Sequence, residues 1–550
     1  MQRHGGKILS DQLLKLGVRR VFSVPGESFL AALDGLYDSG IANIVCRQEG
    51  GAAMMAEAYG KMTGQPGVCF VTRGPGATNA SAGIHVAMQD STPMVLFVGQ
   101  IDNRHTDRET FQEVDYRAMF GGIAKWVAQV DDTDRLPEYI GRAFRVAMSG
   151  RPGPVVLALP ENMLSAAADV PDVRIPNMVP GELPGHATQA IMQALGQARR
   201  PLVVVGGPHW NAQAQADVQA FAEKQQIPVL VGLRRQDYVD NRHPCYGGDL
   251  NVGVNPRLAS RVREADLLLL IGTRFGDIET QGYTLVDPGD PQKTIIHIHA
   301  ASDEIGRVFV PDIGVVATAP AALRALVAAD PVGEWAAWTA AARADYDAWL
   351  APQESPGALK QEEVITWLSD HLPDDAVLTN GAGNYAAWLH RYFVYKQHGT
   401  QLAPTSGSMG YGFPAAIAAS LEYPDRRVVC LAGDGCFQMT CNELSTAIQH
   451  GATPIVVVMD NGRYGTIRMH QEKTYPGRVS GTALVNPDFA ALARAYGGYG
   501  EVVTTTADFA AAFGRAQDSG KLAIIACKVD EEALSTGATL SAVRAAALSR

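Results

Sequence analysis

The chain has 550 residues, which predicts three or four domains of ordinary size. Apolar residues make up 47% and charged residues 19%, so the composition is that of a globular protein and excludes a disordered one. The net charge is −11 and no basic run stands out, so no nucleic-acid partner is expected. No apolar stretch approaches the roughly 20 residues of a membrane helix, and no signal-peptide core follows the N-terminus. Together with seven scattered cysteines, which are typical of reduced thiols, this predicts a soluble cytoplasmic protein without a membrane partner.

Short β-branched runs alternate along the chain with longer helical patterns, which is typical of parallel α/β architecture. The first unit has predicted strands at 18–24, 68–72, 94–98 and 155–159, and a predicted helix over 52–60. A Pro-rich passage over 160–184 predicts a linker. The second unit has predicted strands at 201–207, 227–231, 266–272 and 294–298, and Pro, Gly and Ser over 351–357 separate it from the third. The third has predicted strands at 376–378, 427–432, 454–459 and 523–529. We therefore predict three α/β domains, over residues 1–165, 185–345 and 360–545.

Three glycine-rich turns lie where a strand should meet a helix, beginning near Gly74, Gly407 and Gly433. Glycines there let backbone N–H groups approach a phosphate at a helix N-terminus, although the same glycines can simply build tight turns. The first turn lacks the last glycine of G-x-G-x-x-G, where Asn79 stands, but Asp102 after a following strand keeps a nicotinamide-dependent oxidoreductase open as an alternative. No G-x-S-x-G elbow occurs, which argues against a serine hydrolase.

The third turn is the most informative, because it places Asp434 between two glycines at the end of a predicted strand. The next predicted strand ends at Asp460, followed by Asn461. Neighbouring parallel strands end on the same edge of a sheet, so we expect Asp434 and Asn461 to lie side by side. A carboxylate, an amide oxygen and a nearby backbone carbonyl suit Mg²⁺, which usually keeps phosphate oxygens of a substrate or cofactor as further ligands. The spacing predicts an Mg²⁺-diphosphate site without identifying the cofactor.

The segment Gly433-Asp434-Gly435, with 26 residues between Asp434 and Asn461, resembles the thiamine diphosphate motif of 2-oxo acid decarboxylases and carboligases. Upstream, the segment that carries Glu49 looks like the activating-glutamate segment of that family. The turns at Gly74 and Gly407, and Phe111 with the two residues after it, are similar to the acetohydroxyacid synthase branch. The resemblance covers nearly the whole chain. It implies three doubly wound parallel-sheet domains, in the order pyrimidine-binding, central and diphosphate-binding.

The resemblance also implies roles for individual residues. Asp434, Asn461 and the backbone carbonyl of Arg463 would hold Mg²⁺, and Glu49 would bind the pyrimidine nitrogen and favour the tautomer in which the coenzyme activates itself. Phe111, Gln112 and Lys125 would line the reacting centre. The remaining coenzyme contacts would be Asn79, Gly383, Asn384, Tyr385, Gly407, Met409, Gly433, Gly435 and Cys436. In this family the glutamate serves the coenzyme held by a partner chain, which implies a homodimer or homotetramer.

The implied reaction is decarboxylation of a 2-oxo acid, pyruvate by default, with transfer of the product unit to a second carbonyl. Two positions depart from the acetohydroxyacid synthase branch: Ile278 stands where that branch has Arg, and His470 where it has Trp. These departures put branched-chain amino-acid synthesis in doubt, and Ile467 and His470 are predicted to influence acceptor choice. The flavin-contacting segments of the branch are matched only in part, by Arg151, Gly206, Gly207, Gly272 and Arg274. FAD, ADP or no ligand therefore all remain open for the central domain.

Other interpretations remain beside this one. A simple decarboxylase, or a lyase of another substrate, uses the same coenzyme, whereas a silent regulatory subunit would have no need of Glu49, Asp434 and Asn461 together. His297 and His299 alternate on a predicted strand, but no third metal ligand is evident, so we expect exposed strand-end histidines. The cysteines at 430, 436 and 441 form no C-x-x-C pair and are expected to pack in the core, with Cys436 lending its backbone to phosphate.

Overall fold

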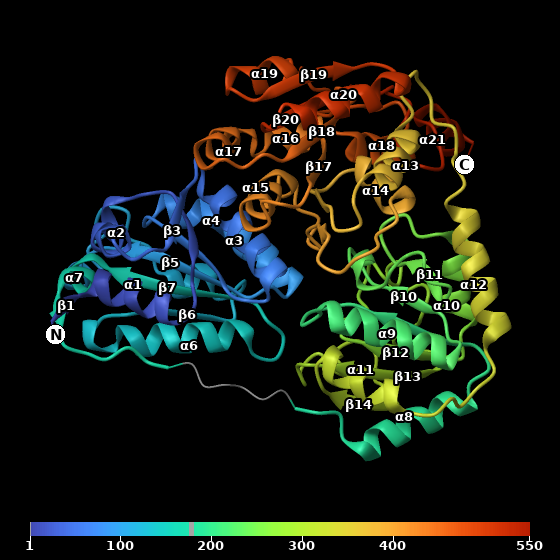
Figure 1. Cartoon of the computed structure of the whole chain (residues 1–550), viewed down its shortest axis with the longest axis horizontal. Helices are drawn as coiled ribbons and strands as arrows, with labels where there is room; N and C mark the ends of the chain where they lie inside the picture. Colours follow the sequence, from blue (N-terminus) through green and yellow to red (C-terminus); the bar gives the residue numbers. More distant parts are fainter. Residues whose placement is uncertain (1, 175–180, 550) are drawn as a thin grey trace.

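The computed structural model of the chain describes residues 2–174 and 181–549. Within them, the strands form three parallel six-stranded sheets and one two-stranded antiparallel pair. Helices cover both faces of the sheets (Figure 1). This confirms the predicted α/β architecture of three parallel sheets. In the described part of the chain, no helix combines the length and the apolar character that a membrane span requires.

The N-terminal domain carries the sheet β3-β2-β4-β5-β7-β6. Its strands are β2 (Arg20–Ser23), β3 (Ala42–Val45), β4 (Gly67–Val71), β5 (Met94–Gln100), β6 (Trp126–Gln129) and β7 (Pro154–Pro160). Its helices are α1 (Gly5–Lys15), α2 (Leu30–Tyr37), α3 (Glu49–Thr63), α4 (Pro75–Asp90), α5 (Tyr116–Phe120), α6 (Leu136–Met148) and α7 (Glu161–Ser165). The short strands β1 (Arg3–His4) and β8 (Ala167–Ala168) pair with each other and join the two ends of this domain.

The central domain carries the sheet β11-β10-β9-β12-β13-β14. Its strands are β9 (Pro201–Val205), β10 (Val229–Val231), β11 (Tyr246–Asp249), β12 (Leu267–Ile271), β13 (Thr294–His299) and β14 (Ile313–Val316). Its helices are α8 (Gly185–Gln197), α9 (Ala212–Gln225), α10 (Pro256–Glu264), α11 (Ala319–Ala328) and α12 (Ala336–Trp349). Residues 351–357, predicted as a linker, contain no helix or strand.

The C-terminal domain carries the sheet β16-β15-β17-β18-β20-β19. Its strands are β15 (Val377–Asn380), β16 (Gln401–Leu402), β17 (Val428–Gly433), β18 (Ile455–Asp460), β19 (Tyr499–Val503) and β20 (Ala523–Lys528). Its helices are α13 (Gln361–His371), α14 (Tyr385–Tyr392), α15 (Gly412–Glu422), α16 (Asp434–Gln438), α17 (Leu444–His450), α18 (Gly465–Thr474), α19 (Phe489–Ala495), α20 (Thr506–Asp518) and α21 (Leu540–Leu548).

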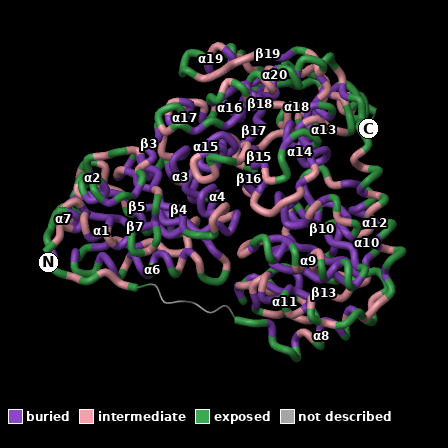
Figure 2. The backbone as a smooth tube through the Cα atoms, viewed as in Figure 1, coloured by how far each residue is buried: buried purple, intermediate pink, exposed green. Residues whose placement is uncertain are grey.

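The N-terminal and C-terminal domains share one apolar core, which runs through α3 and α15 and is buried in Figure 2. The polar centre of this contact is Glu57 of α3, which is fully buried and accepts hydrogen bonds from Tyr411 (2.5 Å) and Thr92 (2.6 Å). Burial raises the pKa of Glu57, because the charged form loses its hydration. The shared core holds the two domains in a fixed relation within one chain.

The predicted linker over 160–184 was wrong at its start. Residue 160 ends β7, and the helix α7 and the strand β8 follow at once, packed against the N-terminal domain. Proline at both ends of the β7 strand made this stretch look irregular, although backbone pairing continues through it. The later part of the predicted linker, residues 175–180, lies outside the described residues.

Candidate active site

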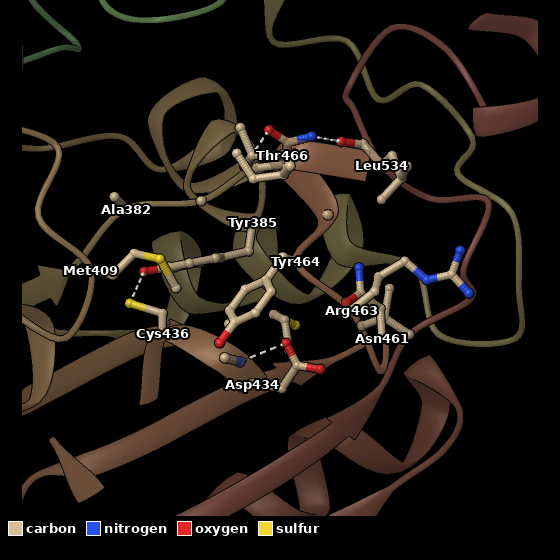
Figure 3. A pocket seen from close by; sticks show the side chains of 18 of the residues that line it. Ala382, Tyr385, Met409, Asp434, Cys436, Asn461, Arg463, Tyr464, Thr466 and Leu534 are labelled. Carbon is tan, nitrogen blue, oxygen red and sulfur yellow. Dashed lines mark hydrogen bonds between the residues drawn. The ribbon is translucent and has the colours of Figure 1, made fainter. Parts of the chain in front are cut away.

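A cavity of about 250 Å³ opens in the C-terminal domain, where the strands β15, β17 and β18 end. Figure 3 shows side chains from several separate segments converging on it. The predicted residues that line it are Gly383, Asn384, Tyr385, Gly407, Met409, Gly433, Asp434, Gly435, Cys436, Asn461, Arg463 and Ile467. The sequence thus identified residues that the fold brings together from positions about 80 residues apart. Their convergence defines the candidate site.

Asp434 lies at the floor of this cavity, as the first residue of α16 directly after β17. Its carboxylate is buried and accepts hydrogen bonds from the backbone N–H of Gly435 and of Gly462, both at 2.8 Å. Burial raises the pKa of Asp434, and the neighbouring carboxylate of Asp460 adds to that rise. A bound cation would offset both penalties, because it supplies the opposite charge that the site lacks.

The strands β17 and β18 pair in parallel, with Gly433 opposite Met459. Asp434 therefore emerges beside Asp460, and Asn461 follows at the same sheet edge, as the sequence predicted from the two strand ends. Asn461 and Arg463 line the cavity next to Asp434 (Figure 3). The guanidinium of Arg463 pairs with Glu531, so this side chain is engaged away from the cavity while its backbone borders it. These groups form an oxygen-rich edge suited to a hard cation.

Asn486 is part of this edge, and sequence reasoning missed it. Its amide donates to the Asp434 carboxylate and to the Asp460 carboxylate, both at 2.7 Å. Lys528 pairs with the second oxygen of Asp460 at 2.5 Å. Asn486 stands 52 residues after Asp434, in a loop before α19, and only its place just ahead of Pro487 signalled a turn. It orients the buried carboxylate of Asp434 from outside the cavity.

Glycines and Tyr385 shape the opposite wall of the cavity. A Cβ added at Gly433 or at Gly383 would come within 2.8 Å of the Tyr385 ring, so the ring occupies the space that side chains would need. Gly383 also has φ of +151°, which other residues rarely adopt. The Tyr385 hydroxyl accepts from the N–H of Gly381 (3.0 Å) and contacts the thiol of Cys436 (3.2 Å). The missing side chains at Gly383 and Gly433 therefore let the Tyr385 ring pack directly on the backbone of this wall.

The other predicted residues of this wall are fixed by contacts inside the protein. The Asn384 amide donates to the Leu534 carbonyl at 2.6 Å, and its oxygen accepts from Thr466 at 2.9 Å. Leu534, which the sequence analysis did not select, thereby places the C-terminal segment along the cavity. Gly407 has φ of +66° in the turn that leads to Met409, whose thioether lies beside Cys436 and Tyr385 in Figure 3.

Glu49 and its predicted neighbours form a second cluster, in the N-terminal domain, and do not line the cavity. Glu49 begins α3, half-buried, and accepts a hydrogen bond from the Asn79 amide at 2.9 Å. Gln112 has φ of +65° and presses against Gly74, and the Phe111 side chain is 71% exposed. Within one chain, the two predicted halves of the site are therefore apart.

Two further predicted residues lie outside both groups. The Lys125 ammonium donates to the backbone carbonyls of Val146 and Ser149, both at 2.6 Å, near the end of α6. Burial lowers the pKa of Lys125 to about 8. His470 is exposed on α18, one turn beyond Ile467, which is 55% exposed at the cavity rim.

The residues that matched flavin-contacting segments lie where the central domain meets the N-terminal domain, with Arg151 on the N-terminal side. Gly207 packs on Gly272 so closely that a Cβ on Gly207 would lie 1.8 Å from the Gly272 carbonyl oxygen. Arg151 pairs with Glu304 at 2.8 Å, and Arg274 donates one hydrogen bond to the Gln89 carbonyl at 3.1 Å. These contacts hold the central domain against the end of α4.

The expectation of exposed histidines was wrong. His297 and His299 on β13 are both buried, because β13 is an interior strand covered on both faces. His297 contacts the Thr273 carbonyl at 3.0 Å, and burial lowers the pKa values of both histidines. Among the described residues, no group of three or more His, Cys, Asp and Glu is arranged to hold a metal ion. All seven cysteines are free thiols, as predicted.

The alternative site of a nicotinamide-dependent oxidoreductase finds no support here. Asp102, the residue considered for a ribose, is held by Arg104, whose backbone N–H and guanidinium both donate to its carboxylate. The Gly74 turn packs on Gln112, and the N–H of Gly74 donates to the Tyr116 hydroxyl at 2.9 Å. The turn is filled by protein contacts.

Comparison with known protein families gives three consecutive matches. Residues 3–119 match the N-terminal TPP binding domain of thiamine pyrophosphate enzymes, residues 188–326 the central domain, and residues 381–527 the C-terminal TPP binding domain. The chain is 31% identical over 533 residues to the acetolactate synthase isozyme 2 large subunit of Escherichia coli (strain K12), covering 96% of each protein. It is 32% identical over 514 residues to an acetolactate synthase large subunit of Corynebacterium glutamicum, covering 90% of this chain and 81% of the relative. The corresponding subunit of Lactococcus lactis is 31% identical over 516 residues, covering 90% and 87%.

Proposed function

Since this chain belongs to the thiamine pyrophosphate enzyme family, we propose that it decarboxylates pyruvate and joins the resulting two-carbon unit to a second carbonyl compound. Decarboxylation and carboligation with thiamine diphosphate are the chemistry of the family, and pyruvate is the donor proposed here because the relatives are acetolactate synthases. The observation that carries the proposal is the cavity on which Asp434, Asn461 and Met409 converge. We also propose domain limits of 1–165, 185–345 and 360–545, inside which the family matches fall.

Mg²⁺ is the metal that fits the oxygen-rich edge of the cavity. Asp434, the amide oxygen of Asn461 and the backbone carbonyl of Arg463 would hold it, and the diphosphate would complete its coordination. The buried Asp434 carboxylate, whose pKa is raised, gives an independent reason to expect a cation there. Asn486 would orient Asp434 toward it without being a ligand.

The chain supplies a shaped pocket, and the coenzyme supplies the reactive carbon and the electron sink for decarboxylation. The backbones of Gly383, Gly435 and Cys436 would cradle the diphosphate, with Asn384 and Tyr385 shaping that wall and Gly433 leaving room for the Tyr385 ring. Met409 would support the bent coenzyme from below, and the Gly407 carbonyl would accept from its amino group. Each of these roles uses a residue that lines the cavity.

We assign Glu49, Phe111 and Gln112 to the cavity of a second copy of this chain. All three lie at the surface of the N-terminal domain or half-buried, and none lines the cavity of their own chain. A homodimer, alone or as half of a tetramer, would join the two halves. Lys125 is left out of the reacting centre because two backbone carbonyls hold its ammonium.

The second substrate would enter over Ile467 and His470, which stand on α18 at the cavity rim and beyond it. Ile278 stands 38% exposed in the loop after β12, so no cation at that position is available for a carboxylate of the acceptor. FAD is left out of the proposed function, because the flavin-contacting segments of the acetohydroxyacid synthase branch are matched only in part.

A proton NMR time course with thiamine diphosphate, Mg²⁺ and pyruvate tests the proposal, beside a Glu49→Gln control. Acetolactate formed by the wild-type protein and much more slowly by the variant is the expected result. Acetaldehyde in its place would indicate a simple decarboxylase. Unchanged pyruvate, in a protein that binds the coenzyme, would contradict the proposed donor and require a panel of other 2-oxo acids.

A further inference from the structure

Asn79 stands in the second turn of α4, where its side chain is exposed yet engaged. Its amide nitrogen donates to the Oε2 atom of Glu49 at 2.9 Å. Among the described residues, no other side chain donates to the Glu49 carboxylate. An exposed amide normally bonds to water, so a direct bond to a half-buried carboxylate on another helix indicates a held geometry.

The two oxygens of the Glu49 carboxylate have different surroundings. Oε2 is taken by Asn79, whereas Oε1 faces Gly76, where an added Cβ would lie 3.2 Å from it. The absence of a side chain at Gly76 therefore keeps space beside Oε1. One oxygen is anchored and the other is available to a further donor.

The backbones that carry these residues are themselves fixed. Gln48 caps α3 by accepting from the N–H of Gly51 at 3.1 Å, so the position of Glu49 as first helical residue is set. The next residue, Gly50, packs on the backbone of Asn79, whose carbonyl oxygen would lie 3.2 Å from a Cβ on Gly50. The remaining freedom lies in the side-chain torsions of Glu49, of which the last, the rotation of the carboxylate, has a broad, shallow preference.

We propose that Asn79 is a positioning residue that fixes the Glu49 carboxylate with Oε1 turned outward, toward the pyrimidine nitrogen of the thiamine diphosphate bound by the partner chain. This rests on the proposed function. The hydrogen bond from the Asn79 amide restricts the rotation of the Glu49 carboxylate. Oε1 would then already point toward the protonated nitrogen of the pyrimidine ring. Small errors in the aim of a catalytic group cost up to about 100-fold in rate.

The neighbouring polar residues of α4, Thr78 and Ser81, form hydrogen bonds only within their own segment. The Thr78 hydroxyl donates to the Gly74 carbonyl at 2.8 Å, and the Ser81 hydroxyl donates to the Thr78 carbonyl at 2.7 Å. Both bonds stay within the turn and helix and reach no other element. Ser81→Ala is therefore a matched control: it removes a polar group from the same helix without touching Glu49.

A double-mutant cycle tests the proposal on the assembled holoenzyme. We expect Asn79→Ala to lower kcat about 10- to 100-fold, with KM and the Kd of thiamine diphosphate changed less than about threefold. Made in the Glu49→Gln background, the same substitution should change kcat less than about twofold, because its effect acts through the carboxylate. Equal losses in both backgrounds would overturn the proposal and place Asn79 on the coenzyme itself.

A spectroscopic readout separates positioning from folding. The near-ultraviolet circular dichroism of the bound coenzyme should lose its wild-type tautomer band in Asn79→Ala and in the isosteric Asn79→Asp, while thermal unfolding of the coenzyme-free protein stays unchanged. Ser81→Ala should keep both properties. A wild-type band in both Asn79 variants would overturn the inference alone, whereas a wild-type protein that binds no thiamine diphosphate would overturn the proposed function beneath it.

Discussion

The N-terminal and C-terminal domains have the same sheet, with strands in the spatial order second, first, third, fourth, sixth, fifth, whereas the central domain runs third, second, first, fourth, fifth, sixth. In both outer domains, residues of the proposed site follow the second and third strands, among others. After β3 and β4 these are Glu49 and the Gly74 turn, and after β16 and β17 they are Met409 and Asp434. Equivalent strand ends therefore carry residues of different chemistry in the two domains.

The difference lies in what each edge encloses. In the C-terminal domain the turns surround a cavity of about 250 Å³, with buried Asp434 at its floor. In the N-terminal domain they present a half-buried carboxylate and an exposed Phe111 toward the surface. Under the proposed function, one edge would anchor a charged ligand, and the other would be completed by a second copy of the chain. The comparison predicts that substitutions at the C-terminal edge weaken coenzyme binding, whereas substitutions at the N-terminal edge lower kcat.

The largest effect is expected from Asp434→Asn. The substitution removes the buried negative charge that a metal would neutralise, so we expect thiamine diphosphate to bind at least about 100-fold more weakly in the presence of Mg²⁺. Isothermal titration calorimetry measures this directly. Asp425→Asn, an exposed carboxylate before β17, is the matched control and should leave binding unchanged. Equal affinity in both variants would contradict the assignment of the metal site.

Glu49→Gln should lower catalytic activity while leaving the binding of thiamine diphosphate largely intact. Because Glu49 belongs to the other edge, we expect thiamine diphosphate to bind within about tenfold of the wild-type affinity, while kcat falls about 100- to 1,000-fold. Steady-state kinetics and calorimetry on the same preparation give both values. Glu138→Gln, on the exposed face of α6, serves as the control. Loss of coenzyme binding in proportion to the loss of kcat would remove the distinction between the two edges.

Mixing the two inactive variants tests whether the edges come from different chains. In a random mixture of Glu49→Gln and Asp434→Asn chains, half of the dimers are mixed, and each mixed dimer has one site with both native residues. We therefore expect recovery to about a quarter of the wild-type activity after unfolding and refolding together. An inactive mixture, with mixed dimers shown by mass spectrometry, would mean that both residues serve a site within one chain.

Much of the fold could be predicted from the sequence, and the strands that the prediction missed have one physical property in common. The four interior strands of each six-stranded sheet were predicted, whereas the six strands missed, β3, β6, β11, β14, β16 and β19, all lie at sheet edges. An interior strand of a parallel sheet is covered on both faces and is apolar along its length. Edge strands such as β14, with alternating half-buried and exposed residues, lack that pattern.

The site residues also divide into those that follow interior strands, which could be predicted, and those in loops, which could not. Asp434 and Asn461 could be paired because each directly follows an interior strand, and strand ends meet at one edge. Asn486 and Leu534 could not, since loops bring them to the cavity and no periodicity marks such loops. The family resemblance supplied the roles of Met409 and Glu49, which spacing alone did not give. His297 and His299 were misjudged because alternation along a strand does not reveal whether both faces are covered.

A smaller effect is expected at the cavity rim. His470 is exposed on the same helix as Ile467, so its replacement by Trp should leave donor decarboxylation within about twofold and change the ratio of products from competing acceptors by a few-fold. Competition between pyruvate and 2-oxobutyrate as acceptors, followed by NMR, measures this. Lys473→Ala, farther along α18, is the control. Identical product ratios in the His470→Trp variant and the wild type would contradict a role in acceptor choice.

The smallest effect concerns an ion pair between two helices of the C-terminal domain. Glu472 of α18 is buried and accepts two hydrogen bonds from Arg544 of α21, at 2.7 and 2.8 Å, which hold its pKa at about 2. A depressed carboxyl pKa stabilises the folded state above the ordinary value near 4.5, and the contribution is lost as the pH falls toward 2.

We expect Arg544→Ala to lower the local stability only modestly, because Arg468 still pairs with Glu472. The loss should appear at pH 7 as faster amide hydrogen exchange in α18 and α21, and the difference from wild type should shrink as the pH falls from 4.5 toward 2. Since α18 also carries Ile467 at the cavity rim, the acceptor side of the cavity should loosen while coenzyme binding at Asp434 stays intact. Exchange that rises throughout the C-terminal domain would instead mean that this ion pair holds the whole anchoring edge together.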